Sequence, residues 1–279
     1  MSMAASTALN GKVALVTGAA AGLGRAIALA FARAGGRLVV CDINDQGLAE
    51  TGTSIEALGA ECLALRCDVS SSSDVASLFN KACDRFGTVH ILVNNAAMIP
   101  TRPENEARRT KHYAYLTTPM PRQSLGFTSS MSDEEWLRFW DVNVHGVFYC
   151  TREALRRMES QRDGKIINIA SVAGISAYSA HSPHYSATKG AVIAFTRSIA
   201  AEVAGANIFV NAIAPGGIHT ETFHAYLEKI GQEKRNQLFQ LIPLGRLGTP
   251  DEYASLAVYL ACDHHYLIGQ VISPNGGLF

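Results

Sequence analysis

The 279-residue chain carries 24 basic and 24 acidic side chains, so its formal net charge is zero. This balance argues against a nucleic-acid-binding protein or a protein held electrostatically at a membrane surface, because both need a basic surplus. Hydrophobic residues make up 48% of the sequence, which is enough for a sizeable core and excludes global disorder. A small-molecule partner fits this composition best.

The N-terminal segment Met1–Asn10 lacks the basic start and long apolar core of a signal peptide. No apolar run approaches the roughly 20 residues needed to cross a bilayer. We therefore expect a soluble, cytoplasmic protein. Six scattered cysteines without a CxxC pair favour reduced, packed thiols. The nine histidines form no convincing ligand triad, so no catalytic metal is predicted.

Short β-branched runs alternate with longer amphipathic stretches. The predicted strands are Val13–Thr17, Arg37–Cys41, Cys62–Cys67, Val89–Val93, Lys165–Ile169, Ile208–Ala212 and Gln270–Ser273. The predicted helices are Leu23–Ala34, Gln46–Leu58, Asp74–Phe86, Glu134–Met158, Tyr185–Val203 and Pro250–Ala261. Continuous apolar strands separated by helices indicate an α/β protein with a doubly wound parallel sheet, covered on both faces. Residues 1–279 are expected to form a single domain of this Rossmann type.

Two segments stand outside this alternation. Residues 98–131 are Pro-rich and aperiodic, which predicts a long loop of functional importance or a disordered one. Two interpretations stay open for this insertion: an arm that meets a substrate carboxylate or phosphate, or a solvated loop or subunit contact. Its charged residues are Arg102, Arg108, Arg109, Lys111 and Arg122 against Glu104 and Glu106. Residues 216–243, rich in aromatic side chains, are interpreted as a mobile substrate lid.

A glycine-rich turn, Thr17-Gly-Ala-Ala-Ala-Gly-Leu-Gly24, joins the first strand to the first helix. Glycines at positions 18, 22 and 24 let backbone amides approach a pyrophosphate, and the helix N-terminus favours an anion. The alternative is a tight strand-to-helix turn without a ligand. The order of strand, turn and helix favours dinucleotide binding.

Asp42 ends the second strand, about 20 residues after the glycines. A carboxylate there accepts hydrogen bonds from the adenosine ribose and repels a 2′-phosphate. Neither Ala19 nor Ile43 supplies a compensating cation. NAD(H) is therefore favoured over NADP(H). An alternative is that Asp42 caps the next helix, a role that Asn44 could fill equally well.

Tyr185 and Lys189 are four residues apart near the start of a predicted helix, and so lie on one helix face. An adjacent ammonium favours the phenolate, so the pair is a candidate acid/base. Ser171 follows a strand and could hydrogen-bond a substrate oxygen. Asn143 interrupts a predicted helix and could hold a water for proton exchange. Each residue alone has a structural alternative: chance spacing, a helix cap or a kink.

Taken together, these motifs resemble the short-chain dehydrogenase/reductase family over essentially the whole chain. The matching features are the TGxxxGxG turn, Asp68 in Cys-Asp-Val, Asn94-Asn-Ala-Ala97, Asn143, Ser171, Tyr185 with Lys189, and Pro215-Gly-Gly-Ile-His-Thr220. Asn94-Asn-Ala-Ala97 replaces the usual NNAG, and the insertion is much longer than usual. The family supplies no role for that insertion.

The resemblance implies roles for individual residues. Tyr185 would be the general acid/base and Lys189 would bind the nicotinamide ribose and lower the tyrosine pKa. Ser171 would orient the substrate, and Asn143 would complete a proton relay. Asn94 would also line the cofactor. The implied cofactor-binding residues are Gly18, Ala21, Gly22, Leu23, Gly24, Asp42, Ile43, Asp68, Val69, Asn95, Ala96, Ala97, Tyr185, Lys189, Pro215, Gly216, Ile218 and Thr220.

The resemblance also implies a seven-stranded sheet of order 3-2-1-4-5-6-7 and a homotetramer, or a homodimer, with helices beginning near Trp136 and Tyr185 at the interface. The expected activity is NAD(H)-dependent interconversion of a secondary alcohol and a ketone. Alternatives within the family are a 3-oxoacyl thioester, sugar or steroid substrate; a different class is a catalytically silent NAD-binding regulator. Expected substrate contacts are Tyr178, His181, His184, His219, Phe223, His224, Tyr226 and Leu227.

Overall fold

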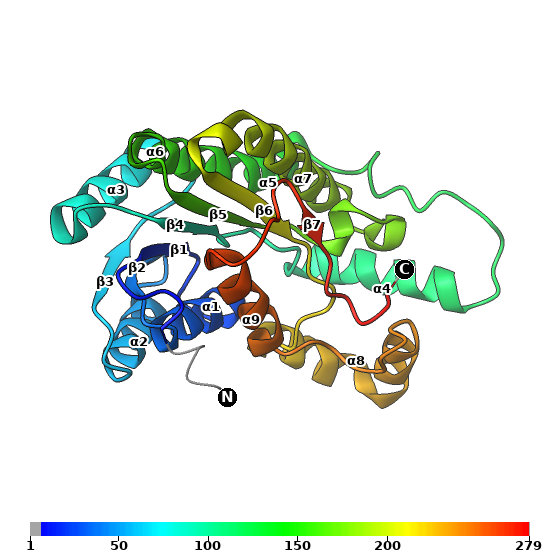
Figure 1. Cartoon of the computed structure of the whole chain (residues 1–279). Helices are drawn as coiled ribbons and strands as arrows, with labels where there is room; N and C mark the ends of the chain where they lie inside the picture. The colour runs from blue at the N-terminus through cyan, green and yellow to red at the C-terminus, as the bar shows by residue number, and fades with distance from the viewer. Residues whose placement is uncertain (1–6, 279) are drawn as a thin grey trace.

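A seven-stranded parallel sheet forms the centre of the protein (Figure 1). The computed structural model describes residues 7–278, so the first six residues of the Met1–Asn10 segment lie outside it. The sheet order is β3-β2-β1-β4-β5-β6-β7, which confirms the predicted topology. The strands are β1 (Val13–Thr17), β2 (Arg37–Asp42), β3 (Cys62–Arg66), β4 (Ile91–Asn94), β5 (Gly164–Ile169), β6 (Ile208–Ile213) and β7 (Val271–Ile272).

Helices cover both faces of this sheet, because alternate side chains of each buried strand point to opposite sides. Along β1, Ala14 and Val16 join one core cluster, and Val13 and Leu15 join the other. The first cluster includes α1 (Gly22–Arg33), α2 (Asp45–Glu56) and α9 (Pro250–Ala261). The second includes α3 (Ser72–Phe86), α6 (Gly146–Gln161) and α7 (Pro183–Val203). Figure 1 shows these two helical layers on either side of the strands.

The predicted single helix Glu134–Met158 is wrong, because the segment is broken in its middle. It consists of α5 (Asp133–Trp140), a π-helical turn (Asp141–His145) and then α6. In the π turn the Gly146 N–H bonds the carbonyl of Asp141, five residues back. Such widened turns are common at functional sites. Asn143 lies at the centre of this one and is fully buried.

The predicted loop at 98–131 is also wrong in part, since it contains α4 (Pro103–Thr117). Pro103 occupies the first turn together with Glu104 and Glu106, a favourable helix start. The buried face of α4 is Asn105, Arg109 and His112. Those positions have helical spacing but are polar, so a search for apolar periodicity does not find the helix.

The segment 216–243 is likewise more ordered than its description as a lid implied. It contains α8 (Glu221–Gln240), which has a kink at Gly231, where φ is +77°. Tyr226, Leu227 and Leu238 bury their side chains in a cluster of their own beyond the end of the sheet. Tyr113 of α4 packs against that cluster, so the insertion and α8 share one small core.

The remaining segments are short helical turns, and most other predicted element ends agree with the structure within two residues. The turns of 3-10 helix are Val172–Gly174, Ala177–Ser179 and Ala204–Ala206. Across residues 7–278, no helix combines the length and the apolar character that a membrane crossing requires. All six cysteines are free thiols, and Cys41, Cys67 and Cys150 are buried.

Candidate active site

A cavity of about 850 Å³ opens at the carboxyl ends of the central strands. Parallel α/β sheets bind ligands at this edge, where neighbouring strands connect in opposite directions. The cavity extends from the glycine turn after β1 to Ser171, Tyr185 and Lys189, and on to α4 and α8. Every residue predicted to bind the cofactor except Asn94 lines it, as do Ser171, Tyr185 and Lys189 among the predicted catalytic residues.

The glycine turn leaves no room for side chains. Gly18 has φ of +65°, and a Cβ atom on it would lie 2.7 Å from the Cα of Ala96. A Cβ on Gly24 would lie only 2.1 Å from the Gly18 carbonyl oxygen and 2.4 Å from Asn95 Nδ2. Asn95 Nδ2 holds the turn by donating to the carbonyls of Thr17 and Gly18, at 3.0 and 2.9 Å. The backbone of the turn is therefore fixed against the loop that follows β4.

The N-terminus of α1 faces the cavity without a side-chain cap. Its N-cap residue is Ala21, and no side chain accepts from the first-turn amides. Uncapped amides at a helix N-terminus attract anions such as phosphate. Gly22, Leu23 and Gly24 of that turn all line the cavity. The bare turn and the uncapped helix fit the pyrophosphate of a dinucleotide.

Asp42 lies beside the glycine turn. Its Oδ2 accepts from the Ala20 amide and its Oδ1 from the Asn44 amide, both at 3.0 Å. Asn44, and not Asp42, caps α2 by accepting from Gly47. The alternative that Asp42 serves as the helix cap is therefore wrong.

Two guanidinium groups lie near Asp42, and both are engaged elsewhere. Arg25 donates to the Ala20 carbonyl and to Glu50. Arg66 donates to the Ile43 carbonyl and lies 3.5 Å from Asp45. Neither arginine lines the cavity.

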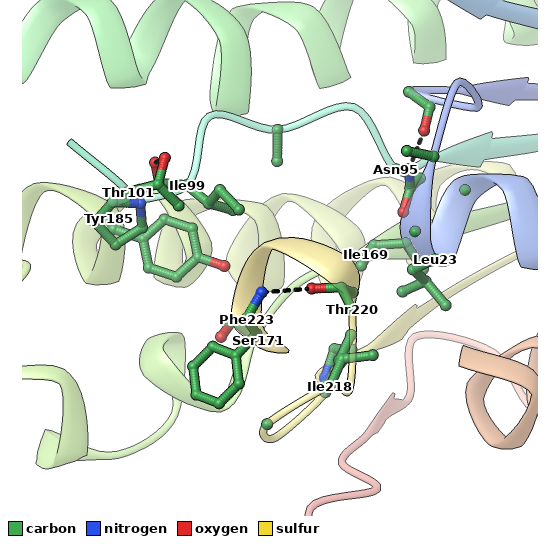
Figure 2. A pocket seen from close by; sticks show the side chains of 18 of the residues that line it. Leu23, Asn95, Ile99, Thr101, Ile169, Ser171, Tyr185, Ile218, Thr220 and Phe223 are labelled. Carbon is green, nitrogen blue, oxygen red and sulfur yellow. Dashed lines mark hydrogen bonds between the residues drawn. The ribbon is translucent and has the colours of Figure 1, made fainter. Parts of the chain in front are cut away.

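Tyr185 and Lys189 extend from the first turns of α7, and Figure 2 shows the phenol of Tyr185 pointing into the cavity. Lys189 Nζ donates to the Ile169 carbonyl at 2.7 Å and lies 5.7 Å from the centre of the Tyr185 ring. Burial lowers the pKa of Lys189 to about 8. Burial also raises the pKa of Tyr185, and the hydrogen bond with Ser171 offsets only part of this. The expected lowering of the tyrosine pKa by Lys189 is thus not found.

Two asparagines singled out in the sequence have side chains that do not line the cavity. Asn143 does not line the cavity; its Oδ1 accepts from the Met98 amide at 2.7 Å, and its Nδ2 donates to Met98 O and Thr188 Oγ1. Its side chain therefore ties the start of the insertion to the π turn and α7. Asn94 is buried within the sheet, where it donates to Thr151 and Asn168. The cavity is lined by Asn95 instead.

We call the part of the cavity between Tyr185, α4 and α8 its substrate end. Only some of the predicted substrate contacts line it. His181, Phe223 and Tyr226 line it, whereas His184, His219, His224 and Leu227 do not. His184 packs edge-on against Phe139, with ring centres 4.0 Å apart. The side chain of Tyr178 lies outside the described part of the structure.

Sequence reasoning left open that the insertion meets the substrate, but it predicted neither α4 nor which of its residues lie in this wall. Glu106, Arg109 and Tyr113 of α4 line the cavity, at helical spacing. His112 Nδ1 lies 3.3 Å from His181 Nδ1, and burial lowers the pKa of both, that of His181 to about 3. Both imidazoles are therefore neutral near pH 7. In the sequence, only the i, i+3, i+7 spacing of Glu106, Arg109 and Tyr113 could have indicated that they form one wall.

The described residues contain no group of three His, Cys, Asp or Glu side chains arranged to hold a metal ion. That no catalytic metal takes part stays a prediction.

Comparison with known proteins agrees with this geometry. The family model described as short chain dehydrogenase matches residues 12–231. A 3-oxoacyl-(acyl-carrier-protein) reductase of Thermotoga maritima is 35% identical over 271 residues, covering 97% of this chain and 98% of the relative. An enzyme with the same activity in its name, from Synechocystis, is 36% identical over 275 residues, covering 98% of each.

Solved structures show the same fold. Levodione reductase superimposes with a TM-score of 0.83 at 28% identity, covering 96% of this chain and 98% of that one. A short-chain type dehydrogenase/reductase from Mycobacterium marinum gives 0.81 at 31% identity, with coverage of 97% and 96%. The chain belongs to the short-chain dehydrogenase family. It is an oxidoreductase of that family, which uses a nicotinamide cofactor.

Proposed function

We propose that this protein interconverts a secondary alcohol and a ketone with NAD(H), using Tyr185 as general acid/base. The observation that carries the proposal is that Tyr185, Ser171 and Lys189 share one cavity with the bare glycine turn. The cofactor, when bound, supplies or accepts a hydride. The protein then needs only to hold the substrate oxygen and move one proton.

Tyr185, Ser171 and Lys189 have different roles in holding the substrate oxygen and moving the proton. The hydroxyls of Tyr185 and Ser171, hydrogen-bonded to each other, form a pair of donors for one substrate oxygen. In reduction Tyr185 gives its proton to that oxygen, and in oxidation it takes the proton back. The Lys189 ammonium favours the phenolate form when it is charged, which its pKa of about 8 allows near neutrality. Asn143 would join a proton relay only through its backbone, because its side chain is fully engaged.

The preference for NAD(H) rests on Asp42. Its carboxylate is held beside the glycine turn, where it would accept from ribose hydroxyls and repel a 2′-phosphate. No basic side chain lines that end of the cavity among the described residues, because the lining cations are Arg109, Lys189 and Lys229. An uncompensated phosphate there would be unfavourable.

A 3-oxoacyl thioester is the second candidate substrate. It is supported by relatives named 3-oxoacyl-(acyl-carrier-protein) reductase at 35% and 36% identity over nearly the whole chain. The cavity is lined by apolar side chains such as Phe223, Ile242 and Leu247, and these suit an alkyl group of either substrate. Sugars and steroids stay in the test panel as less favoured members.

The proposal is tested by following absorbance of the reduced nicotinamide with neutral ketones, secondary alcohols, a 3-oxoacyl thioester, a sugar and a steroid. We expect turnover with NAD(H), and a loss of about 100- to 10,000-fold in kcat for Tyr185→Phe, which removes only the transferable proton. NAD(H) binding to that variant should persist in calorimetry. Binding of NAD(H) by the wild type without turnover of any panel member would favour the silent regulator and contradict the proposal.

We also propose a homotetramer or homodimer built on α5, α6 and α7. Trp136 and Leu137 on α5 are 36% and 56% exposed, and Phe148 on α6 is exposed too. Large apolar side chains grouped on neighbouring helices are typical of a subunit interface. Light scattering on the eluting protein would give the mass, and a monomer at micromolar concentration would contradict this assembly.

A further inference from the structure

Arg108 and Arg109 are adjacent on α4, but only one of them has an anionic partner. Arg108 forms a two-pronged ion pair with Glu135 of α5, at 2.8 and 3.1 Å. Burial alone would raise the pKa of Glu135, but the hydrogen bonds from Arg108 and Asn105 hold it below its usual value. Arg108 thus docks the insertion onto the body of the protein. The charge of Arg108 is balanced.

Arg109 is buried and its charge is not balanced. Its side chain is 9% exposed, and among the described residues no carboxylate oxygen lies within 4.0 Å of its guanidinium nitrogens. Its Nη2 donates to the Pro100 carbonyl at 2.9 Å, and the group lies over the Tyr226 ring at 4.7 Å. These are neutral partners. A buried guanidinium without an anion is costly, unless a ligand supplies the charge.

The Arg109 guanidinium is part of the cavity wall at the substrate end. Arg109 lines the same cavity as Tyr185, together with His181, Phe223 and Tyr226. Its imidazole neighbours, His112 and His181, are neutral near pH 7 and so neither compete with it nor compensate it. An Arg guanidinium presents a fork of donors that matches a carboxylate.

Other charged groups line the cavity, and Glu106 and Arg109 both influence the pKa of Tyr226, but none of the described carboxylates forms an ion pair with Arg109. Glu106 and Glu221 line the cavity but form no ion pair with Arg109. Lys229, from α8, is exposed, and Lys189 is held at the Ile169 carbonyl beside Tyr185. Arg109 is therefore the buried cation that the insertion adds to the substrate end.

We infer that Arg109 binds a carboxylate of the substrate, so that the preferred substrates are hydroxy acids and the corresponding oxo acids. The inference rests on the proposed function, because Tyr185 must exchange a proton with the carbinol oxygen of the same molecule. The insertion then has a role in specificity: α4 brings an anion-binding group to a cavity whose lining near α8 includes apolar and aromatic side chains such as Phe223, Tyr226 and Leu238. A solely structural tether between Pro100 and Tyr226 is the alternative.

The test compares oxo acids of increasing chain length with the methyl esters of the same acids. We expect wild-type kcat/KM to favour the acid at one chain length. In Arg109→Gln the acid-to-ester ratio should fall about 10- to 100-fold, mainly through KM, since a charge-assisted pair is lost. Arg109→Lys, which keeps the charge, should retain part of the preference. Arg122→Gln is the matched control, because Arg122 is exposed in the same insertion and does not line the cavity.

Calorimetry adds a readout that does not need turnover. The NAD⁺-loaded wild type should bind hexanoate more tightly than hexanamide, and Arg109→Gln should lose this difference. If Arg109→Gln does not fold, the comparison is made in the wild type and in Arg109→Lys. Equal losses for acid and ester would assign Arg109 to structure alone and overturn the inference, as would a wild type that prefers the ester. Turnover of neutral ketones without an acid preference would overturn only this inference, whereas no turnover of any alcohol or ketone would overturn the proposed function.

Discussion

The two ends of the cavity are built in different ways. The cofactor end consists of backbone: a glycine turn, an uncapped helix and one carboxylate, all close to β1 and β2. The substrate end consists of side chains from α4, α7 and α8, which begin at residues 103, 183 and 221 of the sequence. Figure 2 shows the two ends facing each other, with Asn95 and Leu23 at one and Tyr185 at the other.

This difference in construction determines how much sequence change each end of the cavity can tolerate. A backbone cradle needs glycine at fixed positions, so it tolerates little change. A wall of side chains can be rebuilt by inserting or replacing one helix, because loops and insertions are tolerated at the surface. We therefore expect substitutions at the cofactor end to abolish binding and those at the substrate end to change selectivity or local stability.

The largest effect is expected for Gly24→Ala. The new Cβ would lie 2.1 Å from the Gly18 carbonyl oxygen, so the turn must move and the phosphate site is lost. Calorimetry should show NAD⁺ binding weakened by more than about 100-fold. Gly205→Ala is the matched control, because nothing lies within 4 Å of a Cβ there. Unchanged NAD⁺ affinity in Gly24→Ala would show that the turn does not hold the cofactor.

A smaller effect is expected for Asp42→Ala combined with Ile43→Arg. The pair removes the carboxylate and adds a cation at an exposed position, since Ile43 is 60% exposed. The ratio of NAD⁺ to NADP⁺ affinity should fall about 10- to 100-fold, as one repulsive charge becomes one attractive charge. Dissociation constants for both nucleotides give the answer. A ratio that stays constant would remove Asp42 as the determinant of cofactor choice.

At the substrate end, Arg108→Gln should act on docking of the insertion. The ion pair with Glu135 is mostly shielded, with side chains 15% and 11% exposed. Its loss should lower the free energy of local opening of α4 by about 1–2 kcal/mol. Hydrogen exchange of residues 103–117 would detect this. Protection should remain in β1 and β4, and an equal loss there would mean that the insertion unfolds only with the whole protein.

The smallest expected effect is the dependence of local stability around His181 on pH. Burial and Arg109 hold the pKa of His181 at about 3, below its unfolded value near 6.5. The unfolded state therefore takes up the proton first, so stability is full above pH 6.5 and declines as the pH falls toward 3. Between about pH 7 and about pH 5, contact of α4 with the loop before α7 should weaken by on the order of 1 kcal/mol. Proteolysis of the insertion at the two pH values measures this, and His181→Gln should reduce the dependence.

The sequence by itself determined the scaffold and most of the catalytic group. Apolar strands alternating with amphipathic helices have a strong period, and the glycine turn and the Tyr185–Lys189 spacing are local patterns that need no distant partner. The sheet order was implied by the family resemblance that these motifs carry, and the structure confirms it.

Only the tertiary structure decided the rest. α4 buries polar residues, so no apolar period marks it, and Asn143 of the π turn is hydrogen-bonded to Met98, 45 residues away. Burial set the raised pKa of Tyr185 and the lowered pKa of Lys189, and neither can be read from a spacing. The different surroundings of Arg108 and Arg109 also arise from distant partners, Glu135 on α5 and Tyr226 on α8. A local pattern specifies a backbone, but the charge balance of a side chain depends on whatever the fold brings against it.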